Sequence, residues 1–388
     1  ISPFPTASGL IMVNVRFPDI SFNSRLVKIG RKNRVSSLYF TSFVANSMNP
    51  SIEDTTGPLQ AYLGSGSGSK IVITTHHKPD ADALGSSLGL YHYLKELGKD
   101  VTVVSPTDYP KFLHWMPGND TVINFEAQRD IAIQKVEEAD LIFCLDFNDL
   151  KRINELGDFV AKSEAKTIMI DHHRDPKGFD DFRFWTIQTS STAELIFDFI
   201  VKYHGEELID SNIAKCLYAG IMTDTGSFRF SSTSSNTHRI IASLMDKGAV
   251  PHQIHSNLYD NFDLRRFKLM GFILYEKLEI IEEYNTALVY LSREDLARFN
   301  IQTGDTEGFV NFGLGVKGIK MSAIIIDRTV MVKMSFRSKD KFPCNELASK
   351  YFNGGGHLNA AGGASKDTLE EVVQRFRDIL PEYKEYLQ

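Results

Sequence analysis

The spacing of hydrophobic and polar positions changes repeatedly from residue 70 onward. Short apolar runs rich in β-branched residues predict buried strands. Between and after these runs, apolar residues recur at helical spacing, as Leu84, Leu88, Tyr91 and Leu94 do within segment 81–98. Strands alternating with helices predict a parallel, doubly wound α/β sheet, which binds ligands at the carboxyl ends of its strands. The predicted strands are 70–77, 100–106, 140–147 and 166–173, and the later helices are 191–205, 211–226 and 234–248.

The pattern changes near Gly248. Segment 248–275 has helical character and indicates a linker between two domains. We therefore predict an α/β domain at 68–247 and a smaller α+β domain at 276–388. The elements expected in the second domain are a strand at 286–292, a hairpin at 321–338, and helices at 293–299, 345–352 and 368–380.

The first 67 residues follow neither pattern. Residues 1–47 carry six Lys or Arg side chains and a single acid, Asp19. That composition is typical of an organelle transit peptide, and equally of an extension that packs poorly on the domain. We favour the second interpretation and treat 1–67 as an N-terminal extension, with "GSGSGS" at 64–69 as a flexible connection.

Composition narrows the class of protein. With 388 residues, 42% of them hydrophobic and 24% charged, the chain is an ordinary globular protein of more than one domain. Its formal net charge of −6 provides no general attraction for nucleic acid, so an anionic substrate requires a local site. The three cysteines form no CxxC pair, which favours a reducing compartment such as the cytoplasm. No apolar run approaches the ~20 residues that a membrane span needs.

Acids and imidazoles follow the ends of three predicted strands and one helix. Because the carboxyl ends of parallel strands meet at one edge, four aspartates gathered there would repel one another unless cations were present. Mixed carboxylate and imidazole ligands suit manganese, magnesium or iron. Two such ions that share a carboxylate stabilise the attacking and leaving oxygens of phosphoryl transfer. The residues are His76, Asp80, Asp82, Asp146, Asp171, His172, His173 and Asp224.

Each of these features has a simpler interpretation when taken alone. An Asp-x-Asp after a strand is often a turn or a helix N-cap. Adjacent histidines are commonly surface or core residues, and a lone Asp at a strand end is usually solvated. The occurrence of all four segments in one chain favours the metal site over these alternatives.

The motifs resemble those of the DHH phosphoesterase family, in the order in which that family carries them. They are "HHKPDADALGS", "LDFND", "IDHH", "GIMTDTGSFRFSST" and "GGGHLNAAGG". The resemblance covers about 68–388 and is greatest to the short two-domain branch, the NrnA-like oligoribonucleases and 3′-phosphoadenosine-5′-phosphate phosphatases. This family usually has Gly between the first two aspartates, where this chain has Ala81. We expect alanine to be tolerated unless the backbone there needs a positive φ.

The resemblance implies two manganese sites and a set of roles. His76, Asp80 and Asp146 would hold one ion, and the second would be held by Asp82, Asp146, His172 and Asp224, with Asp146 bridging. Asp171 would orient the imidazoles, and His173 would lie beside the substrate phosphate as a donor or general acid. His77 has no assigned role.

The second domain is expected to bind substrate. The run at 353–363 has Gly354, Gly355 and Gly356 before His357, followed by small residues that we expect to open a helix. Glycine lets backbone N–H groups approach an anion closely, although such a run is often only a tight turn. Arg337, in the preceding strand, can bind a phosphate bidentately. Arg229, near Asp224, is a second candidate, with a surface ion pair as its alternative role.

With these features, the resemblance implies a manganese-dependent phosphoesterase that hydrolyses short oligoribonucleotides of about two to five nucleotides, and 3′-phosphoadenosine-5′-phosphate, and we expect no covalent intermediate. One alternative is a phosphodiesterase acting on linear or cyclic dinucleotides. A family II pyrophosphatase is disfavoured because its basic phosphate-binding motif is absent from the sequence. An alternative of a different class is an inactive nucleotide-binding or sensing module. A homodimer through the first domain is a further expectation.

Overall fold

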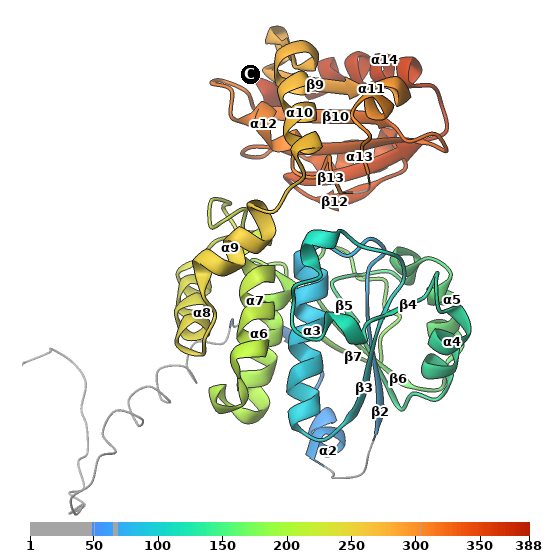
Figure 1. Ribbon diagram of the computed structural model, residues 1–388, viewed down its shortest axis with the longest axis vertical. Helices are drawn as coiled ribbons and strands as arrows, with labels where there is room; N and C mark the ends of the chain where they lie inside the picture. The colour runs from blue at the N-terminus through green and yellow to red at the C-terminus, as the bar shows by residue number, and fades with distance from the viewer. Residues whose placement is uncertain (1–48, 50, 65–68, 303) are drawn as a thin grey trace, which may run out of the picture. The chain divides into compact units, whose positions relative to one another are not determined.

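The computed structural model describes residues 49, 51–64, 69–302 and 304–388 (Figure 1). The predicted extension 1–47 and most of the glycine–serine run at 64–69 lie outside these described residues. Among the residues that are described, no helix has the length and apolar character to cross a membrane.

The N-terminal domain is built on a seven-stranded sheet in the order β1-β7-β6-β5-β2-β3-β4. Every neighbouring pair is parallel except β1 with β7, so the predicted parallel sheet is confirmed. The chain passes from β2 outward to β3 and β4, and then crosses to β5 on the other side of β2. Such a change of direction is where parallel α/β sheets place their ligands. The strands are β1 (Glu53–Asp54), β2 (Lys70–Thr75), β3 (Asp100–Ser105), β4 (Ile123–Asn124), β5 (Leu141–Leu145), β6 (Lys166–Asp171) and β7 (Phe182–Trp185).

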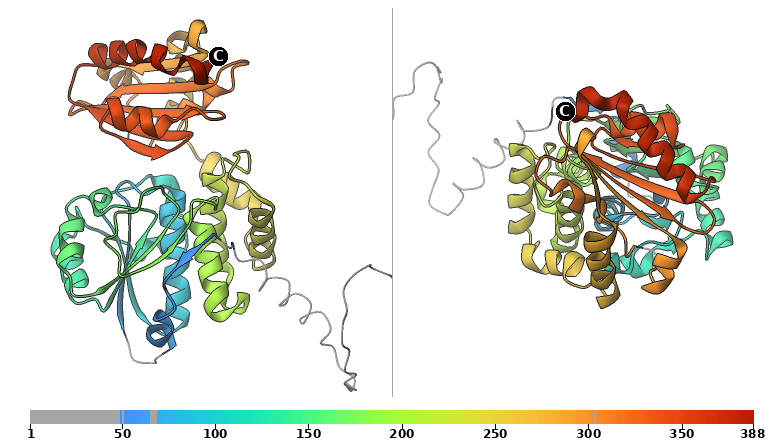
Figure 2. Two further views of the ribbon diagram at one scale, coloured as in Figure 1. Left: turned by 180° about the vertical axis from the view of Figure 1, so that it is seen from behind. Right: turned by 90° about the horizontal axis from the view of Figure 1, so that it is seen from above.

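Helices cover both faces of this sheet (Figures 1 and 2). On one face, α3 (Ala81–Glu96), α6 (Thr192–His204) and α7 (Ser211–Asp224) enclose the larger core with Ile71, Ile73 and Phe143. On the other face, α4 (Arg129–Glu137) and α5 (Leu156–Lys162) pack over Val72 and Ile142. The alternating faces of the buried strands therefore supply two cores, as a doubly wound sheet requires. The remaining helical elements of this domain are α2 (Leu59–Gly64), α8 (Ser235–Asp246), η1 (Lys111–Leu113), η2 (Asn119–Thr121), η3 (Leu150–Ile153) and η4 (Glu206–Leu208).

Part of the predicted N-terminal extension packs against this domain. β1 pairs antiparallel with β7 at the sheet edge, and Leu59 and Leu63 of α2 are buried in the larger core. The Lys202 ammonium on α6 forms an ion pair with Asp54. A two-residue strand and a six-residue helix are too short to show periodicity, which is why the sequence pattern did not reveal them.

Replacing Gly85 with alanine should destabilise the protein by about 2–3 kcal/mol, a common cost of overpacking a core. A Cβ at this position on α3 would lie 2.5 Å from the main-chain oxygen of Cys216 on α7, and a backbone atom cannot rotate away. The melting temperature measures the effect. Gly271→Ala is the matched control, because a Cβ there meets nothing within 4 Å. An unchanged melting temperature for Gly85→Ala would contradict this close helix contact.

The linker consists of α9 (Pro251–Tyr259), α10 (Leu264–Phe272) and the π-helical turn η5 (Ile273–Lys277). The second domain has a mixed six-stranded sheet in the order β12-β13-β11-β10-β9-β8, with separate cores on its two faces. The predicted α+β character and the helical linker are confirmed. Its strands are β8 (Glu279–Ile281), β9 (Thr286–Leu291), β10 (Met321–Asp327), β11 (Val332–Ser338), β12 (Gly355–His357) and β13 (Ala360–Ser365). Its helical elements are η6 (Glu282–Tyr284), α11 (Arg293–Arg298), α12 (Val310–Leu314), α13 (Cys344–Tyr351), α14 (Leu369–Ile379), η7 (Leu380–Tyr383) and α15 (Lys384–Leu387).

The glycine run at 353–363 is a β-hairpin, and the helix start that we expected after it is wrong. β12 and β13 pair antiparallel, with His357 opposite Ala360. A Cβ at Gly354 would lie 1.9 Å from the main-chain oxygen of Gly362, and Gly356 has a φ of 142°. The close approach of the two strands therefore requires glycine here for packing, independently of any ligand.

Candidate active site

The first part of the site forms where β2 passes into α3. Asp80 is the N-cap of α3, and its Oδ1 accepts hydrogen bonds from the main-chain N–H groups of Asp82 and Ala83, each at 3.0 Å. Asp82, in the first turn, is thereby held at the start of the helix. Ala81 is the first residue of α3 and is not among the residues with positive φ, so the usual glycine is not required here.

The second part forms at the end of β5. Asp146 follows this strand with a φ of 65°, and its main-chain N–H donates to the carbonyl oxygen of Ile170 on β6. The Thr192 hydroxyl donates to Asp146 Oδ1 at 2.9 Å. The main-chain N–H groups of Thr192 and Ala193 donate to the two oxygens of Asp82 at 2.8 and 2.9 Å. The N-terminus of α6 therefore holds two carboxylates that are 64 positions apart in sequence.

Asp146 lies between two imidazoles. Its Oδ2 is 3.4 Å from Nε2 of His76, and its Oδ1 is 3.4 Å from Nε2 of His172. His76 Nε2 is also 4.0 Å from Asp80 Oδ2. One carboxylate is thus shared by three groups of potential ligand atoms, and His76, Asp80 and Asp146 form the first of them. Asp146 also forms a group with Asp171 and His173, whose Nδ1 is 3.6 Å from Asp146 Oδ1.

The second group surrounds His172. Its Nε2 is 3.6 Å from Asp224 Oδ2 at the end of α7 and 3.9 Å from Asp82 Oδ2. Asp82, Asp146 and His172 have ligand atoms close enough to hold one ion, and Asp224 adjoins them. Asp82 and Asp146 are each only 2% exposed. The six residues that the sequence indicated as metal ligands are therefore brought together.

The pKa values of the carboxyl groups indicate which kind of ligand the site is suited to bind. Burial, then repulsion from Asp146, raises the pKa of Asp82 well above its usual range. Burial raises the pKa of Asp224 to about 7, against the attraction of His172. Burial acts in the same direction on Asp146, but hydrogen bonds from His172 and His76 hold its pKa well below the usual range. Buried carboxylates that otherwise take up protons, arranged with imidazoles, are a donor set that fits divalent cations.

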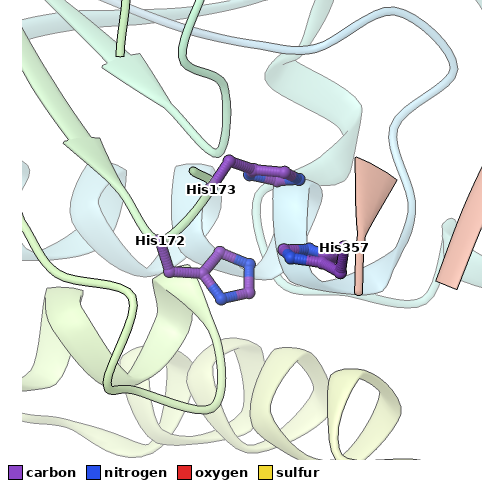
Figure 3. A group of neighbouring side chains, drawn as sticks. All are labelled: His172, His173 and His357. Carbon is purple, nitrogen blue, oxygen red and sulfur yellow. The ribbon is translucent and has the colours of Figure 1, made fainter. Parts of the chain in front are cut away.

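Three histidine rings lie together beside this group (Figure 3). The His173 and His357 rings are stacked, with centroids 4.3 Å apart and an interplanar angle of 25°. His172 lies 4.8 Å from His357 between centroids. Asp171 Oδ1 is 2.7 Å from His173 Nδ1, and its buried Oδ2 has no hydrogen-bond partner among the described residues. His357 comes from β12, so the second domain contributes an imidazole directly to the site.

The hydrogen bonds of the two expected arginines and of His77 are made with main-chain carbonyl oxygens. Burial lowers the pKa of Arg337 on β11, against the attraction of neighbouring groups that include Asp224, Glu307 and Asp80, and its Nη1 donates to the Phe336 carbonyl oxygen. Arg229 donates to the Gly226 carbonyl oxygen within its own turn, an alternative to the surface ion pair that we considered. The His77 ring nitrogen Nδ1 is 2.9 Å from the Arg152 carbonyl oxygen, which is a structural contact.

Sequence reasoning missed Thr192, whose hydroxyl and main-chain N–H both contact site carboxylates. The signal was present: "SSTAEL" places Ser191 before an apolar helix, and Ser191 is the N-cap of α6. An N-cap predicts free N–H groups at that point, which are natural partners for carboxylates.

Comparisons with known proteins agree with this arrangement. The model of the DHH family, N-terminal domain, matches residues 70–221, and the DHHA1 domain matches 285–386. The Thermus thermophilus protein named bifunctional oligoribonuclease and PAP phosphatase NrnA is 30% identical over 316 residues, covering 80% of this chain and 89% of that protein. The Streptococcus mutans protein named probable bifunctional oligoribonuclease and PAP phosphatase NrnA is 29% identical, covering 80% and 94%.

Solved structures share the fold. An exopolyphosphatase-related protein from Bacteroides fragilis has a TM-score of 0.82 at 40% identity, covering 88% of this chain and 99% of that one. RecJ from Thermus thermophilus, in complex with Mn2+, has a TM-score of 0.53 at 12% identity, covering 91% of this chain and 58% of that one, which shows a common fold alone.

The fold and the site together define a class of two-domain proteins. The first domain is a parallel α/β domain with a cluster of Asp and His residues at its strand ends, and the second is built on a mixed sheet. The matches above place the chain within that class: it belongs to the DHH family. The family resemblance indicated by the sequence motifs is confirmed.

Proposed function

We propose that the protein is a phosphoesterase that works with two divalent cations, most favourably manganese. The position of Asp146 carries the proposal, since its two oxygens face His76 and His172 separately. His76, Asp80 and Asp146 would hold one cation, and Asp82, Asp146, His172 and Asp224 the other. When bound, such a pair supplies positive charge that stabilises the oxygens of an in-line displacement at phosphorus.

The chain's own residues orient the substrate and exchange a proton with one of its oxygens. Asp171 accepts from Nδ1 of His173, which leaves Nε2 of that ring available to exchange a proton with a substrate oxygen. His357 packs on the ring and limits its rotation. Arg337 provides a permanent cation for a phosphate, because a guanidinium stays charged throughout the physiological range.

For the substrate, we propose short oligoribonucleotides and 3′-phosphoadenosine-5′-phosphate. Two relatives of similar length carry those activities in their names. Hydrolysis of linear or cyclic dinucleotides is the enzymatic alternative, and the name of the Bacteroides fragilis relative adds inorganic polyphosphate. A binding module without activity is disfavoured, because every residue type needed for two cation sites is present. The cytoplasmic location and the homodimer stay predictions.

With manganese added, the purified chain should release mononucleotides from di- to pentaribonucleotides and AMP from 3′-phosphoadenosine-5′-phosphate. A chelator should reduce both rates to background, and fresh manganese should restore them, because the buried carboxylates need cations to act together. Product chromatography measures both reactions, with a cyclic dinucleotide, pyrophosphate and polyphosphate assayed alongside. Tight nucleotide binding without any turnover would overturn the phosphoesterase and favour the sensing module.

A further inference from the structure

Thr192 is the first residue of α6, and its hydroxyl is a buried polar group that the roles above do not use. The hydroxyl donates to Asp146 Oδ1 at 2.9 Å. Within a helix, a threonine hydroxyl commonly bonds the carbonyl oxygen three or four residues earlier. Thr192 directly follows the N-cap Ser191, so no earlier turn of α6 offers such a carbonyl. The hydroxyl is therefore available to the carboxylate.

This hydrogen bond distinguishes the two oxygens of Asp146. Oδ1 accepts from the hydroxyl and is 3.4 Å from Nε2 of His172, whereas Oδ2 is 3.4 Å from Nε2 of His76. The terminal torsion of an aspartate is broad and roughly two-fold, so the carboxylate turns unless its oxygens are held. An imidazole nitrogen that binds a cation can no longer donate a proton. Of these three neighbours, the hydroxyl is therefore the one that can still hold Asp146 when the cation sites are filled.

The position of the hydroxyl is itself well defined. A β-branched side chain has few rotamers. The main-chain N–H of Thr192 donates to Asp82 Oδ2 at 2.8 Å, and that of Ala193 donates to Asp82 Oδ1 at 2.9 Å. Thr192 thus contacts Asp82 through its main chain and Asp146 through its side chain. A substitution separates the two contacts, because it removes the hydroxyl and leaves the N–H group in place.

We propose that Thr192 is a positioning residue whose hydroxyl fixes the orientation of Asp146, so that the carboxylate offers one oxygen to each of the two cation sites. The inference rests on the proposed function and deepens it, because it names the group that holds the shared ligand. Hydrogen-bond partners behind a metal ligand typically contribute about tenfold to a hundredfold to metal affinity. Thr192 should contribute that much while touching neither the cations nor the substrate.

Calorimetric titration with manganese tests the role on Thr192→Val, which keeps the branched shape of the side chain and removes the donor. The wild type should bind two ions. The variant should bind at least one of them about tenfold to a hundredfold more weakly. Thr192→Ser keeps the hydroxyl and should recover most of the lost affinity. This rescue distinguishes the hydrogen bond from simple packing, since serine lacks the methyl group that valine retains.

Thr167→Val is the matched control. Thr167 is also buried, and its hydroxyl donates to a carboxylate outside the site, Asp181 Oδ2, at 3.1 Å. It lies near the start of β6, at the opposite end of the strand from the site. The control should keep both manganese affinities, even if its melting temperature falls. Should Thr192→Val fail to fold, Thr192→Ser and Thr192→Ala give the same comparison, because those two side chains differ only in the hydroxyl.

Unchanged affinity for both ions in Thr192→Val, or an equal loss in Thr192→Val and Thr192→Ser, would overturn the positioning role. The titration requires no substrate, so it separates this role from the proposed function. A wild type that binds two ions but hydrolyses none of the substrates would refute the phosphoesterase, and the rescue by serine would still support the role of Thr192. A wild type that binds fewer than two ions would overturn both.

Discussion

Replacing Asp146 with alanine should abolish hydrolysis, with a fall in kcat/KM of at least about 10³-fold, because loss of cation-borne charge stabilisation is worth several kcal/mol. Among the residues that the structure describes, Asp146 is the one carboxylate with ion-pair contacts to both His76 and His172, at 3.4 Å each. Its removal would take a ligand from each of the two proposed cation sites, whereas removal of Asp80 or Asp82 would weaken only one of them. Calorimetric titration with manganese should show the stoichiometry fall from two in the wild type.

The folded structure should survive this change. Asp146 is buried and accepts hydrogen bonds from the Thr192 hydroxyl, His172 and His76, so its loss leaves these donors without that partner but also relieves the repulsion with Asp82. Asp158→Ala provides the control, since it removes the same charge from an exposed position of α5. Full manganese stoichiometry in Asp146→Ala, or activity equal to that of the control, would refute a bridging role.

The arrangement of the first domain could be predicted because two simple regularities act together. Apolar runs of five or six residues predicted β2, β3, β5 and β6, and the alternation with helices predicted that they are parallel. Parallel strands bring their carboxyl ends to one edge, so residues that follow them, such as Asp146 and His172, had to lie near each other. The local sequence pattern was enough to predict this site, because the direction of the parallel strands alone brings its residues to one edge of the sheet.

Contacts that depend on packing could not be predicted in the same way. The hairpin β12–β13 replaced an expected helix start, because alanine and glycine have no periodicity that distinguishes a tightly packed strand pair from a loop. The stacking of His173 on His357 joins residues 184 positions apart, and nothing in either segment marks the other as its neighbour. Thr192 was missed for a related reason, since its partners Asp82 and Asp146 are distant in sequence.

His173→Ala should lower kcat by about 10²- to 10³-fold, the usual range for loss of a positioned proton-transfer group. The ring has the features of such a group. Asp171 binds its Nδ1 at 2.7 Å, which fixes the tautomer and leaves Nε2 without that proton. Burial lowers the pKa of His173, against the pull of Asp171, so the neutral ring is favoured and can take up a proton and release it. Single-turnover kinetics at saturating substrate measures kcat for the chemical step.

The manganese stoichiometry separates this role from that of a ligand. The proposed function does not use His173 as a ligand, so His173→Ala should still bind two ions, unlike Asp146→Ala. The test is needed because His173 also forms a group of potential ligand atoms with Asp146 and Asp171. Asp171→Asn is the companion variant: an amide can donate to Nδ1 and favour the opposite tautomer, so it should lower kcat while the imidazole remains. If His173→Ala lost an ion, His173 would be a ligand, because a proton-transfer residue has no reason to change stoichiometry. If kcat were unchanged, substrate protonation would have to come from elsewhere, and the stacked His357 is the nearest imidazole able to provide it.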